Sequence, residues 1–231
     1  MKDWSRTAEQ IMLAAVEGKI RLLGITSPVS GSGTSTVARG VAEAYARSGH
    51  KALLLDLTAN VRRDARPPRW VPGGQSAAAA VDVEPTGLAV LTADATLATK
   101  ALFNNVDFLQ QTLGTELSGY TAVVMDLPAV REDEDNRLNP LAAARVADAV
   151  LMVCLTGQID RTQLGNAVET LKMAGANLAG VVLNDYFGTT FGDEVAEHLD
   201  GRSLLVPGLS RKLAKMARSS RFLTEAFPYF R

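Results

Sequence analysis

The sequence predicts an α/β domain in which helices cover both faces of a mostly parallel β-sheet. Three observations lead to this fold class. Short apolar runs alternate with amphipathic stretches along the whole chain. These runs are apolar almost throughout, as strands buried on both faces are. A turn rich in glycine and serine joins the first run to a helical stretch, which is the order strand, loop, helix. A single domain over residues 1–231 is expected, with no linker dividing it.

The apolar runs are the predicted strands. They are bounded by polar and turn-forming residues and are too short to cross a membrane. Since helical stretches separate them, a parallel arrangement is expected. The runs cover residues 21–26, 51–57, 87–93, 120–127, 147–155, 178–184 and 203–207.

The predicted helices lie between and beside these runs, where apolar residues recur at helical spacing. They cover an N-terminal helix at residues 1–19 and further helices at 35–48, 98–118, 160–174, 191–200 and 210–220.

Two segments depart from the alternation of runs and helices, residues 60–86 and a short acidic loop at residues 131–136. Residues 60–86 are rich in Pro, Gly and Ala, and we expect an irregular excursion over the surface. Residues 208–231 are expected to form a basic C-terminal helix and tail, with an apolar stripe along one side. A solvated basic face is the simpler interpretation of this helix, and contact with an acidic partner or anionic lipid is the alternative.

Bulk composition narrows the function classes. The 231 residues carry a net charge of −1, so nothing global indicates a nucleic-acid partner. The one cysteine, Cys154, cannot form an internal disulfide and fits a reducing cytosol. Nothing resembles a secretory signal, so we expect any membrane association to depend on a partner or a surface helix. His50 and His198 are isolated, and no Cys/His spacing predicts a metal site.

The glycine- and serine-rich turn has the features of a phosphate-binding loop. Two glycines allow the chain to curl, and a helix start near Thr34 directs its dipole at an anion. The hydroxyl of Ser35 stands where it would bind Mg²⁺ beside the phosphates. Thr34, however, occupies the position of the lysine that reaches the β- and γ-phosphates. The expected phosphate-binding residues are Gly31, Ser32, Gly33, Thr34, Ser35 and Thr36.

Polar residues also end three of the predicted strands. Asp56, Asp126 and Asn184 each follow an apolar run. Open parallel sheets bind ligands at the carboxyl ends of their strands, and a charged residue that ends an apolar run belongs at a water-filled rim. We therefore expect all three side chains at the same edge as the loop.

Taken together, several segments resemble the cytoplasmic bacterial tyrosine kinases (BY-kinases), a group within the ParA/MinD-like P-loop ATPases. The segments are "ITSPVSGSGTSTVARGVAEAYARSGHKALLLDL", "GLAVLTA", "YTAVVMDLPAV" and "ADAVLMVCLTGQIDRTQLGNAVETLKMAGANLAGVVLND". The resemblance covers roughly residues 20–185 and implies a P-loop NTPase-like fold. It also implies work with a membrane polysaccharide co-polymerase in capsule or exopolysaccharide export.

The resemblance implies a role for each matching position. ATP or ADP would bind with Mg²⁺, and Asn184 would contact the adenine. Ser35, Asp56 and Asp126 would hold the metal, the two aspartates as acidic residues of the Walker motifs and as catalytic residues if the protein is active. Arg62 and Arg63 match an arginine pair of the family.

The chain departs from the family pattern at positions that serve catalysis, oligomerisation and phosphorylation in the kinases. Thr34 replaces the loop lysine, and Thr58 replaces the second acidic residue of an Asp-x-Asp motif. Met12 and Ala15 stand where an N-terminal oligomerisation motif has arginines. The tail, which is rich in tyrosines in the kinases, holds Tyr229 alone. The sequence therefore predicts a pseudokinase whose binding of nucleotide is weak or absent.

Three functions follow from this interpretation. The first is a pseudokinase, cytoplasmic and peripheral to the bacterial inner membrane, that docks on the cytoplasmic region of a co-polymerase, with self-association left open and no nucleic-acid partner. The second is a working ATPase or tyrosine kinase in which Arg62 or Arg63 reaches the phosphates. The third is a ParA/MinD-like positioning ATPase, which would need a lysine-rich loop that this chain lacks.

Overall fold

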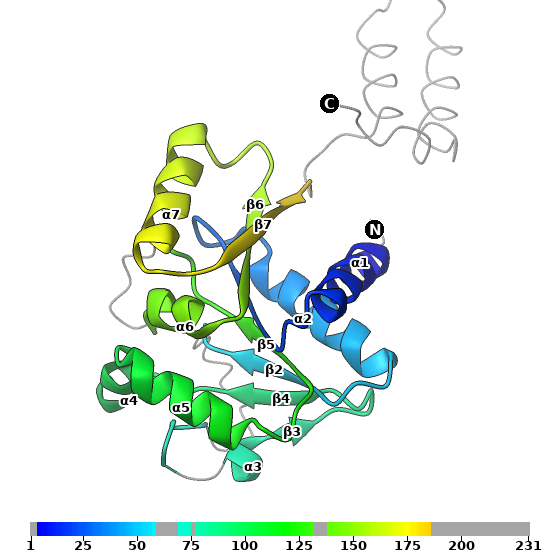
Figure 1. Cartoon of the computed structure of the whole chain (residues 1–231). Coiled ribbons are helices and arrows are strands. Elements are labelled where there is room, and N and C mark those ends of the chain that lie inside the picture. Colours follow the sequence, from blue (N-terminus) through cyan, green and yellow to red (C-terminus); the bar gives the residue numbers. More distant parts are fainter. Residues whose placement is uncertain (1–3, 59–68, 75–76, 132–137, 186–231) are drawn as a thin grey trace, which may run out of the picture. The chain divides into compact units, whose positions relative to one another are not determined.

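The computed structural model describes residues 4–58, 69–74, 77–131 and 138–185. They form a seven-stranded sheet in the order β3-β4-β2-β5-β1-β6-β7. Neighbouring strands run parallel except for β3 and β4, which are antiparallel. Figure 1 shows the sheet with helices on both sides. The predicted fold class is confirmed.

The strands are β1 (Leu22–Thr26), β2 (Ala52–Asp56), β3 (Asp82–Val83), β4 (Ala89–Thr92), β5 (Ala122–Asp126), β6 (Ala149–Leu155) and β7 (Leu178–Asn184). The helices are α1 (Trp4–Glu17), α2 (Thr34–Arg47), α3 (Ala77–Ala80), α4 (Leu97–Phe103), α5 (Val106–Glu116), α6 (Pro140–Val146) and α7 (Arg161–Met173).

Two apolar clusters, one on each face of the sheet, make up the core. The first joins the sheet to α5, α6 and α7 through residues such as Leu53, Met125 and Leu171. The second joins the opposite face to α1 and α2 through residues such as Leu54 and Val124. Helices α1 and α2 lie together on this second side in Figure 1. The branched and leucine side chains that fill both faces are what a buried parallel sheet requires.

The alternation of side chains along a strand decides where the predicted site residues point. Leu54, Val124 and Val182 belong to, or pack against, the α2-side cluster. The residue two positions later on each strand must face the same side. Asp56, Asp126 and Asn184 are those residues, so all three lie on the face that α2 covers.

Six of the seven predicted strands appear as β1, β2, β4, β5, β6 and β7. The strand predicted at 203–207 and the helices predicted at 191–200 and 210–220 lie outside the described residues. The single helix predicted at 98–118 is wrong, because α4 and α5 separate at Asn104–Asn105. Asn105 accepts a hydrogen bond from the backbone N–H of Phe108 and so begins a new helix.

The described part of residues 60–86 is more ordered than the expected surface excursion. Trp70 is 1% exposed, and its backbone N–H donates to the carbonyl of Thr92 at the end of β4. Its indole N–H donates to Oε2 of Glu116 at 2.8 Å. The large aromatic side chain of Trp70 therefore holds the residues around it against β4 and α5, although the sequence of this segment shows no regular pattern.

The N-terminal helix α1 also explains two departures from the BY-kinase pattern. Met12 and Ala15 are buried in the cluster between α1 and α2. A charged residue in this position would be costly to bury.

The chain divides after Asn184 into two units. The first is the sheet and its helices, and the basic helix and tail predicted at 208–231 lie outside the described residues. The expectation of a single domain over 1–231 stays a prediction. No helix in the described ranges is both long and apolar enough to span a bilayer.

Candidate functional site

The loop between β1 and α2 has the backbone conformation that a phosphate-binding loop needs. Gly31 and Gly33 have φ values of +82° and +89°, a region that only glycine adopts readily. Gly33 is the N-cap of α2, and no side chain in the described part caps the helix start. The first backbone N–H groups of α2 are therefore left for an anion, where the helix dipole also favours negative charge.

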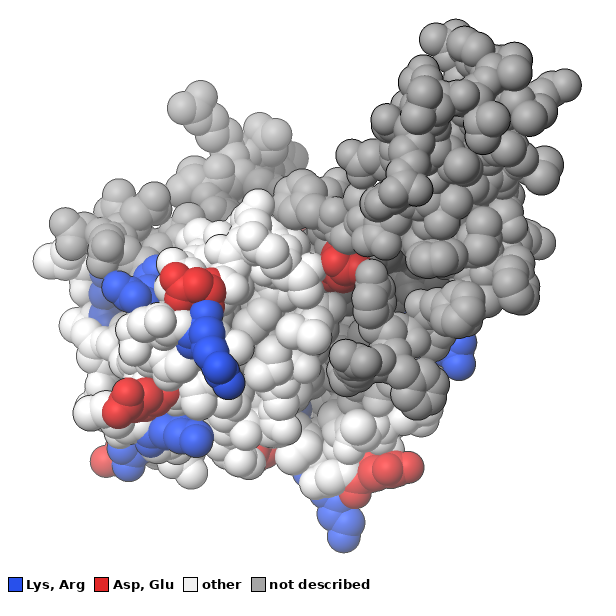
Figure 2. Space-filling model, turned by 90° about the horizontal axis from the view of Figure 1, so that it is seen from above, with Lys and Arg blue, Asp and Glu red and all other residues white. Residues whose placement is uncertain are grey.

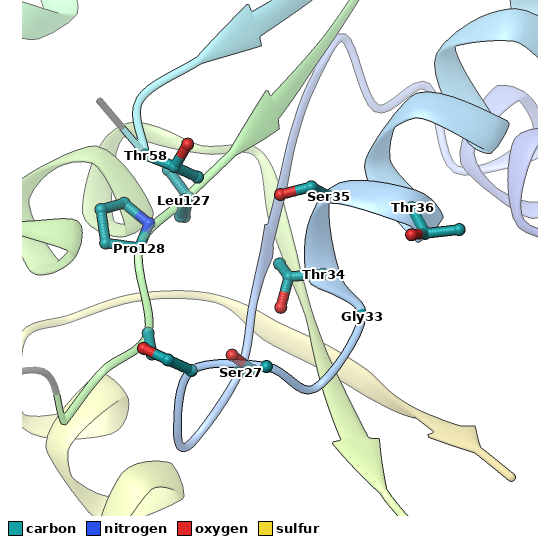
Figure 3. A pocket seen from close by; sticks show the side chains of 11 residues that line it. Ser27, Gly33, Thr34, Ser35, Thr36, Thr58, Leu127 and Pro128 are labelled. Atoms are coloured by element: carbon teal, nitrogen blue, oxygen red, sulfur yellow. The ribbon is translucent and has the colours of Figure 1, made fainter. Parts of the chain in front are cut away.

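A cavity of about 320 Å³ opens in front of this loop. Figure 3 shows Thr34 and Ser35 at its inner side and Thr58, Leu127 and Pro128 across from them. Ligand pockets in proteins start at about this size. The cavity is lined by Ser27, Ser30, Gly31, Gly33, Thr34, Ser35, Thr36, Thr58, Leu127, Pro128 and Ala129.

The lining is rich in hydroxyl groups, and none of its described members is a lysine or an arginine. Thr34 lies in the cavity wall, at the position where a phosphate-binding loop has its lysine. A threonine side chain is short and uncharged, so the loop supplies no positive charge there. Ser32 does not line the cavity. Its buried side chain donates to the carbonyl of Val29 at 2.9 Å and braces the loop from behind.

Asp126 is the most perturbed acid near the cavity. It is 4% exposed, and its Oδ1 has no hydrogen-bond partner in the described structure. Burial raises the pKa of Asp126 to about 7, against a hydrogen bond from Ser35 that lowers it. The negative charge of Asp56 raises the same pKa, and the positive charge of Arg39 lowers it.

Asp56 lies beside Asp126, because the two are register partners at the ends of β2 and β5. Its Oδ1 has partners, in contrast to Oδ1 of Asp126. Both the backbone N–H and the hydroxyl of Thr58 donate to Oδ1 of Asp56, at 2.9 and 2.7 Å. Oδ1 of Asp56 therefore accepts two hydrogen bonds, whereas Oδ1 of Asp126 accepts none in the described structure.

These residues fit a Mg²⁺ ion. Hydroxyl and carboxylate oxygens are the ligands that Mg²⁺ takes in nucleotide sites, where it keeps several waters. Ser35 and Asp126 are joined by a hydrogen bond, and the unpartnered oxygen of Asp126 lacks the donor or cation that a buried acid needs. Asp56 completes the predicted set. No group of three or more His, Cys, Asp or Glu residues suited to a metal occurs in the described ranges.

Asn184 reaches the loop from the end of β7. Its amide nitrogen donates to the carbonyl of Ser32 at 2.9 Å, in a buried position. The side chain is 7% exposed and does not line the cavity. The structure thus brings Asn184 to the predicted site, in contact with the loop backbone.

Sequence reasoning missed Arg39, which lies one helical turn after Ser35 on α2. Its guanidinium donates to Oε1 of Glu84 at 2.8 Å, and its charge acts on Asp126. The spacing of four residues from Ser35 was the available signal, because it places both side chains on the same side of the helix. Arg62 and Arg63 lie outside the described residues.

Figure 2 shows one face of the molecule, on which blue and red side chains of the described residues are interspersed. At the cavity itself, the backbone N–H groups of the loop are the dipoles available to an anion.

Comparison with known proteins gives relatives by structure alone. No protein-family model matches the chain, and no curated protein matches it. Its structure is similar to the kinase domain of Escherichia coli tyrosine kinase ETK, with a TM-score of 0.63 and 20% identity over 75% of this chain and 71% of that one.

Two further solved structures are similar over more of the chain. Cobyrinic acid a,c-diamide synthase from Mycobacterium smegmatis, with bound ATP analogue and magnesium, has a TM-score of 0.61 and 18% identity over 92% of this chain and 100% of that one. The MinD cell division protein of Aquifex aeolicus has a TM-score of 0.57 and 18% identity over 84% and 78%.

At identities of 18–20%, these likenesses establish the fold. The structural neighbours include both kinds that the sequence predicted, tyrosine kinase domains and a MinD protein. The chain has the P-loop NTPase-like fold that they share, with a lysine-free loop at the position where that fold binds phosphate.

Proposed function

We propose that the chain is a pseudokinase of capsule or exopolysaccharide export, which docks on the cytoplasmic region of a membrane polysaccharide co-polymerase. The observation that carries this proposal is Thr34 in the wall of an otherwise complete phosphate loop, with no basic residue among the described lining residues. The partner and its location at the inner membrane follow from the resemblance to BY-kinases.

The free energy of the hydrogen bond that a loop lysine would make to the phosphates indicates that catalysis is lost while binding is only weakened. A hydrogen bond to a charged group contributes about 1.5–3 kcal/mol, so its absence weakens nucleotide binding roughly ten- to a hundredfold. Phosphoryl transfer suffers more, because negative charge develops on the same oxygens in the transition state. A site of this kind retains MgADP or MgATP weakly and does not turn it over.

Thr58 supports the same conclusion. In the position of a second acidic residue it provides a hydroxyl, and that hydroxyl is bound to Asp56. A hydroxyl with a pKa far above neutrality cannot serve as the general base that an acidic residue would provide. Cation and base are thus both replaced by threonine in this chain.

A working ATPase or tyrosine kinase is the alternative within the same fold. It requires a cation from outside the loop, and Arg39 is engaged by Glu84 and Glu43. Arg62 and Arg63 are the other candidates. ATP turnover that is abolished by Asp126→Ala and by replacement of both Arg62 and Arg63 would favour this alternative.

Calorimetric titration with ATP and ADP in the presence of Mg²⁺ tests the proposal, on the wild type and on Thr34→Lys. We expect weak or undetectable binding to the wild type, binding at least tenfold tighter to Thr34→Lys, and no phosphotransfer by the wild type. Micromolar binding together with ATP turnover by the wild type would overturn the pseudokinase proposal.

Docking needs a separate test. The chain should be expressed with and without a candidate membrane polysaccharide co-polymerase, and membranes should be separated from the soluble fraction. We expect it with the membranes only when the co-polymerase is present, and equally for wild type and Asp126→Ala. A distribution that ignores the co-polymerase would contradict the docking proposal.

A further inference from the structure

The segment that follows β5 is paired with the residues that lead from β1 into the phosphate loop. The backbone N–H of Leu127 donates to the carbonyl of Ile25 at 2.9 Å, and the hydroxyl of Thr26 donates to the carbonyl of Pro128 at 2.7 Å. These bonds hold one wall of the cavity, where Leu127 and Pro128 lie across from Thr34 (Figure 3). The segment therefore has a fixed position relative to the loop.

The pairing continues as far as Arg131. The backbone N–H of Val130 donates to the carbonyl of Ser27 at 2.8 Å, and that of Arg131 donates to the carbonyl of Pro28 at 3.2 Å. Ser27 lines the cavity, and so does Ala129, which precedes Arg131 by two residues. Hydrogen bonds thus fix the backbone of Arg131 beside the cavity, next to the residues that begin the loop.

The side chain of Arg131 is available for an interaction at this position. It is exposed to solvent, whereas the neighbouring Val130 packs against the core cluster that includes α5, α6 and α7. The ion pairs between described residues join Arg39 and Arg47 to glutamates, and none of them includes Arg131. A guanidinium on a long side chain, held by no described acid, can turn to an anion in the neighbouring cavity.

The charges around the cavity leave a bound anion in need of a cation. Asp56 and Asp126 place two carboxyl groups at this edge of the sheet, and Thr34 adds no positive charge. The charge of Arg39 acts on Asp126, but its guanidinium is already held by a glutamate at 2.8 Å. Arg131 is an arginine whose backbone is bonded to the start of the loop and whose charge has no described acidic partner.

We propose that Arg131 is an anion-binding residue of this site, whose guanidinium binds a phosphate group held by the loop. Arginine suits this role because its N–H groups match the oxygens of a phosphate in pairs. The inference rests on the anion-binding loop of the proposed function, and it names a residue outside the phosphate-loop motif. Only binding is assigned to Arg131, because Thr58 still replaces the base that phosphoryl transfer would require.

Calorimetry on the full chain tests this role, with MgADP and magnesium pyrophosphate as ligands. The variants are made in Thr34→Lys, where binding is expected to be measurable. Arg131→Gln should weaken both ligands by the same factor, roughly three- to tenfold, since one charge-assisted but solvent-screened hydrogen bond is lost. Arg131→Lys should lose less than Arg131→Gln, because it keeps the positive charge.

Two further measurements separate the charge of Arg131 from a structural role. The factor lost in Arg131→Gln should shrink as the salt concentration rises from about 0.05 to about 0.5 M, because salt screens an exposed charge. The urea midpoint of Arg131→Gln should equal that of its parent, since the hydrogen bond to Pro28 comes from the backbone.

Arg145→Gln is the matched control. Arg145 is also exposed, but it lies near the end of α6, just before the amino end of β6 and thus at the sheet edge opposite the cavity. The substitution removes the same charge from the protein and should leave both affinities unchanged.

The outcomes distinguish this inference from the proposed function. Unchanged affinities in Arg131→Gln, or an equal loss in Arg145→Gln, would overturn the inference alone, provided that Thr34→Lys binds the ligands. Absence of binding by Thr34→Lys would refute the anion-binding loop and this inference with it. ATP turnover by the wild type would refute the pseudokinase proposal while leaving the factor lost in Arg131→Gln unaffected.

Discussion

The backbone N–H and the hydroxyl of Thr58 both donate to one carboxylate oxygen of Asp56, at 2.9 and 2.7 Å. Asp56 in turn lies in register with Asp126 on the neighbouring strand. Two carboxylates at this spacing repel each other, and the donors from Thr58 offset the charge of one of them. Thr58 therefore stabilises this acidic edge of the sheet. An aspartate at position 58 would instead add a third negative charge beside Asp56 and Asp126.

Replacement of Thr58 by aspartate should destabilise the protein. The substitution removes a hydrogen bond to a charged group, which contributes about 1.5–3 kcal/mol, and adds repulsion from Asp56. Urea unfolding at neutral pH and low salt should show the loss, and millimolar Mg²⁺ should recover part of it.

Thr58→Ser is the control for this prediction, because it keeps the hydroxyl donor. Its free energy of unfolding should stay near that of the wild type. If Thr58→Asp were as stable as Thr58→Ser without Mg²⁺, the hydroxyl hydrogen bond to Asp56 and the added charge would contribute nothing measurable.

Asp126 should make the stability depend on pH. Burial raises the pKa of Asp126 to about 7 in the folded protein, whereas an unfolded aspartate has a pKa near 3.9. The folded state therefore holds a proton that the unfolded state loses, and the stability that Asp126 contributes declines as the pH rises from about 4 to about 7. Above pH 7 the penalty is constant, on the order of 4 kcal/mol.

Asp126→Asn should remove this dependence. Its free energy of unfolding should exceed that of the wild type at pH 8 and approach it at pH 4. Asp82→Asn, on the exposed strand β3, serves as the control and should keep the wild-type slope. A slope between pH 4 and 7 that is the same in Asp126→Asn and the wild type would contradict the assignment.

The sequence was sufficient for six strands of the sheet and for the edge that carries the site, but not for the two-residue strand β3. Apolar runs that end in Asp56, Asp126 and Asn184 placed these residues at the carboxyl ends of their strands. The expectation of a water-filled rim was wrong for Asp126 and Asn184, which are both buried. The loop between β1 and α2 could also be predicted, because its glycines indicated a tight turn. The positive φ angles of Gly31 and Gly33 agree with this prediction.

The parts that could not be predicted depend on contacts between distant residues. Nothing near Trp70 in sequence indicates that its indole meets Glu116 on α5, and so the segment appeared irregular. Helix α6 was missed because it is short and rich in alanine, a residue with little power to distinguish a buried helix from a loop. The partner of the Asn184 amide likewise appears only once the fold is formed.

The contact between Trp70 and Glu116 should be worth a measurable part of the stability. Each oxygen of Glu116 accepts one hydrogen bond, from the indole of Trp70 and from the backbone N–H of Gly73, both at 2.8 Å. In Glu116→Gln the amide group faces one of these donors, so one bond to a charged acceptor is lost at a cost of about 1.5–3 kcal/mol. Unfolding followed by fluorescence in a Trp4→Phe background, where Trp70 is the remaining tryptophan, measures this cost.

Glu17→Gln, at the exposed end of α1, is the matched control and should leave stability unchanged. Should Glu116→Gln behave like Glu17→Gln, the segment around Trp70 would be held by burial of the indole alone.

The last prediction separates the two constraints on Gly33. Gly31 and Gly33 both have left-handed backbones, but a Cβ at Gly31 would meet nothing within 4 Å, whereas one at Gly33 would meet Asn184. Gly31→Ala should therefore cost only the backbone strain, about 1–2 kcal/mol. Gly33→Ala should cost more, because the amide of Asn184 must also move away from Ser32.

A double-mutant cycle with Asn184→Ala measures the second contribution. The cost of Gly33→Ala should fall toward that of Gly31→Ala when Asn184 is already alanine, since the clashing amide is gone. The cost of Gly31→Ala should be the same with either residue at position 184. Equal costs of Gly33→Ala in the two backgrounds would mean that Asn184 does not confine the start of α2.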